Sequence, residues 1–177
     1  MLYDNYLPGI PQQYWERYVQ QQTPTSAIPI PAGGSSSILN KTILNQRGIL
    51  RKIFLGFDSP LVEAVFTIDG QNIVAGINDL FYSGQTRAES GMPYVVKYDQ
   101  LHNVYAVAWF PDAPFNNDLN VSVRNYDSRT VYVATFFEVL LFKDGFYTKL
   151  RELMYGSSQQ QPQPHPIPEN EAIITII

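Results

Sequence analysis

The chain has 177 residues and a formal net charge of −4, and charged residues make up only 16% of it, against roughly 25% in an average soluble protein. Lys and Arg form no tract, which argues against specific nucleic-acid binding. The absence of cysteine excludes disulfides and thiolate metal sites. No apolar run reaches the ~20 residues that span a bilayer, and the first residues lack a signal-peptide pattern. A chain with so little charge is typical of a subunit whose surface mostly contacts other protein chains.

Residues 1–36 are predicted to form an N-terminal arm with one short amphipathic helix. Pro11 suits the first position of a helix, and one face behind it collects aromatic and apolar side chains. These side chains are Tyr14, Trp15, Tyr18 and Val19. A Pro-, Gly- and Ser-rich linker follows. We expect this cluster to dock on a neighbouring molecule, with packing on its own domain as the alternative.

Residues 37–155 are predicted to form an all-β domain, a single eight-stranded antiparallel jelly-roll sandwich. Short apolar runs recur with turn residues between them, as in sandwiches and barrels, and eight strands in two sheets is the jelly-roll count. Asp69-Gly70 predicts a type I′ hairpin turn, residues 78–82 a single helical turn, and residues 146–155 a closing helix. The expected strands are 38–44, 48–57, 61–68, 71–75, 94–98, 103–110, 119–125 and 130–142.

The strand patterns also predict which faces are buried. Residues 119–125 alternate apolar and polar, so one face of that strand should meet water. Residues 131–142 are apolar on both faces except at Thr135 and Glu138, which predicts a central strand covered on both sides, by a neighbouring subunit on one. The expected core residues are Phe66, Ile68, Val121, Val123, Val133 and Phe137.

Residues 156–177 form a Gln- and Pro-rich linker that ends in a β-prone apolar hexamer. Its branched side chains are Ile173, Ile174, Ile176 and Ile177. Such a segment promotes aggregation when it is left free, so it is expected to pair with a sheet edge of its own chain or of another subunit.

The sequence carries no recognisable catalytic constellation. Both histidines, His102 and His165, lack a second ligand at metal-binding spacing, and no phosphate-binding loop or nucleophile motif occurs. A calcium site at Asp112, Asp118 and Asp127 is a weaker interpretation than turn formation, which is the usual role of loop aspartates. A glycosidase pair at Asp58 and Glu63 is a weak hypothesis, because any sandwich contains carboxylates. We therefore expect a protein that is not an enzyme, with no cofactor, no metal and no small-molecule substrate.

The domain resembles the small, upright single jelly-roll capsid proteins of tailless icosahedral viruses with an internal membrane, which infect archaea and thermophilic bacteria. The stretches that carry the resemblance are residues 48–54, 65–70 and 131–137. The resemblance implies an icosahedral shell built from many copies, with the arms linking them, and a location in the virion after assembly in the host cytoplasm. The implied partners are copies of the chain itself, with a second capsid protein and an underlying viral membrane as further candidates.

Two other functions remain open from the sequence. The first is a head-decoration or fibre accessory protein, which would attach to a pre-formed head instead of forming the lattice. The second is a carbohydrate-binding sandwich, in which Tyr94, Tyr98 and Tyr105 would stand as exposed aromatics on one face.

Overall fold

The computed structural model describes residues 7–88 and 91–156. They belong to two units: Pro11–Asp144, which holds both sheets, and a smaller one that combines Met1–Ile10 with Gly145–Ile177. The larger unit is an all-β sandwich of antiparallel strands, as the sequence predicts. Neither α-helix in the described part of the chain has the length and apolar character needed to cross a membrane.

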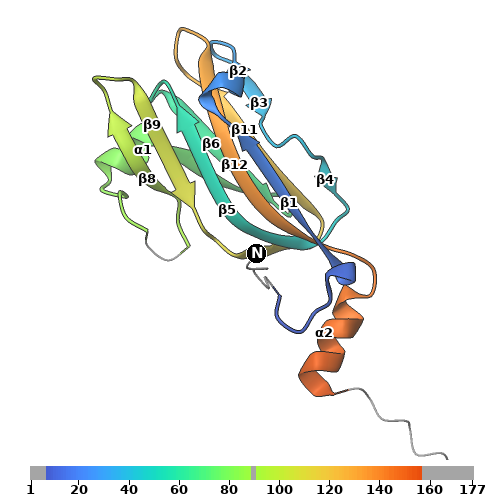
Figure 1. Cartoon of the computed structure of the whole chain (residues 1–177). Coiled ribbons are helices and arrows are strands. Elements are labelled where there is room, and N and C mark those ends of the chain that lie inside the picture. Colours follow the sequence, from blue (N-terminus) through green and yellow to red (C-terminus); the bar gives the residue numbers. More distant parts are fainter. Residues whose placement is uncertain (1–6, 89–90, 157–177) are drawn as a thin grey trace, which may run out of the picture. The chain divides into compact units, whose positions relative to one another are not determined.

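One sheet has seven strands, and five of them follow one another in the order β1-β12-β5-β9-β8 (Figure 1). Two short strands extend this sheet. β2 pairs with β12 beyond the end of β1, and β10 pairs with β5 beyond the end of β9. The bounds are β1 Trp15–Gln22, β2 Ile28–Ile30, β5 Gly48–Phe57, β8 Tyr94–Asp99, β9 Val104–Trp109, β10 Ala113–Phe115 and β12 Val131–Phe142.

The second sheet has five strands, with the order β3-β11-β6-β7 and β4 pairing with β11. The bounds are β3 Ser35–Ser37, β4 Ile43–Leu44, β6 Val62–Ile68, β7 Gln71–Gly76 and β11 Asp118–Asn125. Asp69 and Gly70 both have positive φ and join Ile68 directly to Gln71, which confirms the predicted type I′ turn. The predicted helical turn is also present, as α1 Ile77–Tyr82.

The core lies between the two sheets. Five of the six predicted core residues are buried: Phe66, Val121, Val123, Val133 and Phe137. The sixth, Ile68, is half-buried and packs against the same cluster. β12 has β5 on one side and β1 on the other, so the strand predicted to be central is central.

The predicted N-terminal helix is wrong. Residues 12–14 form a single 3-10 turn, and Trp15–Gln22 is a regular strand paired with β12 along its whole length. The physical reason is the apolar, β-prone sequence of β12, whose second edge needs a hydrogen-bonding partner. The segment predicted to be a tethered arm therefore belongs to the sandwich itself.

The strand connections do not establish the predicted jelly roll. β5 pairs with β12 in one sheet, and the strands next to them in sequence, β6 and β11, pair in the other. However, β7 folds back on β6 and β9 pairs with β5. The described residues hold twelve strands, where eight were expected, because short pieces such as β2, β3, β4 and β10 add to the longer ones.

The smaller unit contains α2, Phe146–Tyr155, which matches the helix predicted at residues 146–155. Gly145 precedes it with a φ of 81°, a left-handed conformation that glycine adopts without steric cost. Lys149 and Glu152 form an ion pair one turn apart, with 2.9 Å between Nζ and Oε2. The domain predicted to run over 37–155 is thus found in a unit that starts at Pro11 and ends at Asp144.

Candidate docking surface

The outer face of the seven-stranded sheet carries a row of very small residues between two rows of large ones. Gly56 on β5 lies opposite Ala134 on β12 and opposite Ala106 on β9, so three neighbouring strands present almost no side chain at this level. Two residues along the strands, Phe54 lies opposite Phe136. Because successive outward residues are two apart, this register produces a channel that runs across the strands.

This channel is an apolar groove with a volume of about 810 Å³. Its floor is the row of small residues, one side is the phenylalanine pair, and the other side carries Tyr132 and Val104. Thr23, Pro24 and Ala27 lie at the β1 end, and Lys97 lies at the β8 end. We call this feature the apolar groove.

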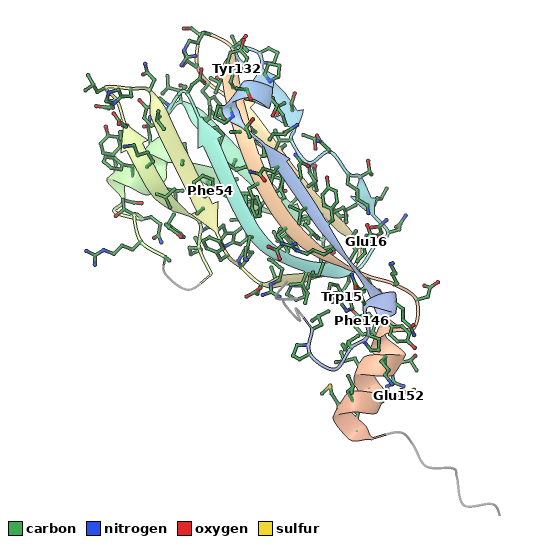
Figure 2. The ribbon with its side chains drawn as sticks, viewed as in Figure 1. Trp15, Glu16, Phe54, Tyr132, Phe146 and Glu152 are labelled. Carbon is green, nitrogen blue, oxygen red and sulfur yellow. The ribbon has the colours of Figure 1, made fainter. Side chains whose placement is uncertain are left out.

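The large side chains around the groove are exposed. Phe54 is 44% exposed, Tyr132 52% and Val104 45%; Figure 2 labels Phe54 on β5 and Tyr132 on β12. Single exposed apolar residues are ordinary on a protein surface, but a set gathered around one channel marks an interaction site. This face is therefore the best candidate for a docking surface.

The same face becomes charged on the other side of the phenylalanine pair. Glu138 on β12 lies opposite Lys52 on β5 and Val19 on β1. Its Oε1 is 3.4 Å from Nε of Arg17, and its Oε2 is 3.4 Å from Nζ of Lys52. The Glu138 carboxylate is buried, and the two cations offset part of the cost of its desolvation, although Oε2 accepts no hydrogen bond from the described residues. The outer face thus has an apolar half and a polar half.

A second pocket, with a volume of about 620 Å³, is polar. On one side Arg129 donates to Asp58 at 2.8 Å and lies 3.5 Å from Asp127, which accepts a hydrogen bond from the Ser59 hydroxyl at 2.7 Å. The Ser59 bond lowers the pKa of Asp127, and the Asp58 bond raises the pKa of Arg129. These bonds join the β5–β6 and β11–β12 loops.

The opposite side of the polar pocket is aromatic. Tyr98 stacks on Phe81 with 3.8 Å between ring centroids, and its hydroxyl donates to Asn78 Oδ1 at 2.8 Å. Tyr82 lies at the rim and is 73% exposed. Burial raises the pKa of Tyr98. This arrangement would suit a polar ligand with one flat face.

The predicted carbohydrate platform does not form. Tyr105 is buried in the core, and one face of Tyr98 is covered by Phe81, so Tyr94, Tyr98 and Tyr105 do not present a row of exposed rings. The reason is that Tyr98 and Tyr105 pack against the core cluster.

Of the predicted acid and histidine candidates, Asp58, Asp127 and His102 line the polar pocket, and His165 lies outside the described residues. His102 is in the β8–β9 turn, where its Nδ1 lies 3.0 Å from Asp99, and this bond holds the pKa of Asp99 well below its usual range. Asp112 pairs with Arg51, whereas Asp127 pairs with Arg129. Within residues 7–88 and 91–156, no three acidic or histidine side chains gather as a metal site requires.

Of the four predicted partner residues of the N-terminal segment, Trp15 and Tyr18 pack within the sandwich. Trp15 is buried, and Tyr18 is half-buried against the core, its pKa raised by that burial. Val19 is 39% exposed on the outer face and remains available to a partner. Tyr14 belongs to the 3-10 turn before the strand. The predicted contacts at Ile173, Ile174, Ile176 and Ile177 lie outside the described residues.

Sequence reasoning missed the groove residues, although one signal pointed to them. The expectation that residues 131–142 are covered on both faces implied a partner for the outer one. The small residues Gly56, Ala106 and Ala134 lie on three different apolar strands, and only the register shows that they fall at one level across the sheet.

Comparison with protein-family models finds no match, and comparison with curated proteins finds none either.

Proposed function

We propose that the chain is a structural protein, a β-sandwich subunit that assembles with copies of itself as a capsid protein of the single jelly-roll type. The observation that carries the proposal is the apolar groove, where Phe54, Tyr132 and Val104 stand exposed on one face of the sheet. A contiguous apolar surface of this kind is typical of a protein–protein contact. A charged fraction of 16% supports the same reading, because a lone monomer usually carries more charge.

The jelly-roll relationship is supported by the nested strand pairs. A jelly roll is a long antiparallel pair of strands rolled up so that successive parts of the pair lie in alternate sheets. β5 with β12, followed by β6 with β11, has this arrangement. The β6–β7 hairpin and the β5–β9 pair would then be departures specific to this chain.

Self-association tests the proposal most directly. We expect the purified chain to show a concentration-dependent increase in weight-average mass in sedimentation velocity. The variant Phe54→Glu places a charge in the groove wall and should shift the equilibrium toward the monomer by at least tenfold. Val74→Glu is the matched control, because Val74 is 50% exposed on β7 of the other sheet. A wild-type chain that stays monomeric at all concentrations would refute the proposal.

Electron microscopy of the assembled material separates the capsid proposal from the accessory one. A capsid protein should form closed shells, alone or with a second capsid protein. A decoration or fibre protein should instead form small oligomers that bind pre-formed heads. Closed shells that persist after removal of other virion proteins would favour the capsid reading.

The polar pocket supports carbohydrate binding as a second candidate function. Its exposed Tyr82 and the polar groups of Asn78, Gln100 and Asn103 are of the types that contact sugars. A glycan-array screen tests this candidate, with Tyr82→Ala as the variant that should abolish any signal. Binding that is unchanged in Tyr82→Ala would place the sugar elsewhere.

A further inference from the structure

The apolar groove is narrow and short, and these dimensions restrict what it holds. It runs across four neighbouring strands, β12-β5-β9-β8, which amounts to three strand spacings or ~14 Å. On β12 and β5 its floor is one residue row wide, because Phe136 and Tyr132 flank Ala134 and Phe54 flanks Gly56. On β9 the next outward residue, Ala108, is also small. At ~3.3 Å per residue, an extended segment of four to five residues matches this length.

The groove by itself is too small to be a whole subunit interface. Its footprint of ~14 Å by ~13 Å is about 200 Å², whereas a specific interface buries ~800 Å² on each partner. A contact of that size is effective when its ligand is tethered, because tethering raises the local concentration. A short segment joined by a linker therefore suits the groove better than the flat face of a second sheet.

The chain carries a segment of matching length and character. Residues 173–177 are Ile-Ile-Thr-Ile-Ile, five residues of which four are branched and apolar. The preceding residues include Glu169 and Glu171, and Lys97 at the β8 end of the groove, which forms an ion pair with Asp99 at 3.1 Å, is a cation that they can approach. Residues 157–171 add 15 positions, or up to ~50 Å of extended chain, which is enough to reach an adjacent molecule.

We infer that the apolar groove is the receptor for residues 173–177 of a neighbouring copy, which lie across β12, β5, β9 and β8 with isoleucine side chains over the small-residue floor. This inference rests on the proposed assembly function and identifies the two surfaces that meet when copies assemble. Each copy would both offer a segment and accept one, so the contact is heterologous and extends from molecule to molecule.

The lack of natural cysteine allows a direct test by disulfide trapping. Full-length Ala134→Cys, with the thiol on the groove floor, is mixed with full-length Ile174→Cys under mild oxidation. We expect mixed disulfide dimers in at least fivefold higher yield than from Val74→Cys with Ile174→Cys, because a disulfide needs Cα atoms within about 7 Å. Val104→Cys, at the groove rim, serves as a second reporter if Ala134→Cys disturbs folding.

The outcomes separate the alternatives. Equal yields with the Val74→Cys control would overturn the inference. Predominant Ala134→Cys homodimers would also overturn it, because the groove of a second copy would then be the occupant. In a chain that carries both Ala134→Cys and Ile174→Cys, a disulfide formed only within one molecule would overturn docking on a neighbour. If the wild type associates but no mixed disulfide forms, the inference about the groove is overturned and the proposed assembly function stands. If the wild type is strictly monomeric, both the inference and the proposed function are overturned.

Discussion

Gln20 offers the sharpest test of whether the N-terminal strand is a structural part of the sandwich. Gln20 is 5% exposed on the inner side of β1. Its Nε2 donates to the Ile38 carbonyl at 2.7 Å and to Thr135 Oγ1 at 3.2 Å, and its Oε1 accepts from the Asn40 N–H at 2.8 Å. One side chain therefore joins β1, β12 and the segment before β4.

The variant Gln20→Leu removes these bonds with little change in volume. The buried Ile38 carbonyl and the Asn40 N–H lose their side-chain partner, and each such loss costs about 1–3 kcal/mol. The greater apolar burial of leucine offsets about 1 kcal/mol of that cost. We expect the free energy of unfolding to fall by about 2 kcal/mol, a large share of the stability of an ordinary domain.

Urea unfolding followed by tryptophan fluorescence measures this change, since the described residues include Trp15 and Trp109. The matched control is Gln21→Leu, whose side chain is exposed on the opposite face of the same strand. We expect the control to change stability by less than ~0.5 kcal/mol. Equal changes in the free energy of unfolding for the two variants would refute this reasoning. Residues 15–22 would then act as a detachable arm, not as part of the sandwich.

Two further predictions concern β5 and the β6–β7 turn. Gly48→Ala should destabilise the domain by ~3 kcal/mol or prevent folding, because the added Cβ would overlap the Leu140 carbonyl. Gly56→Ala should be near neutral, because the atom closest to its added Cβ is the Ala134 Cβ at 3.6 Å. The urea midpoints of the two variants measure the difference. The backbone N–H groups of residues 116–118 lower the pKa of Asp69. A lowered folded-state pKa gives stability that is present above the unfolded value and lost as pH falls through the folded one, so Asp69→Asn should flatten the decline in the urea midpoint below about pH 4. An unchanged acid slope in Asp69→Asn would show that other carboxylates dominate.

The sequence alone was sufficient where a local signal decides the structure. Asp69 and Gly70 tolerate positive φ, so their turn could be predicted from two residues. The alternation of residues 119–125 set which face of β11 is buried, and the apolar run 131–142 marked the central strand. In each case the determining interactions lie within a few residues of one another, and burial follows from the pattern of polarity.

Tertiary structure decided what depends on partners far apart in the chain. The apolar residues at 14, 15, 18 and 19 fit a helical period, yet residues 15–22 pair along their whole length with the free edge of β12. The apolar groove exists only because Gly56, Ala106 and Ala134, on three different strands, share one level across the sheet. A shift of one residue in the β12–β5 or β5–β9 pairing would turn a large inward side chain to the outer face, where it would fill the channel. The register that prevents this is set by the packing of the whole sandwich.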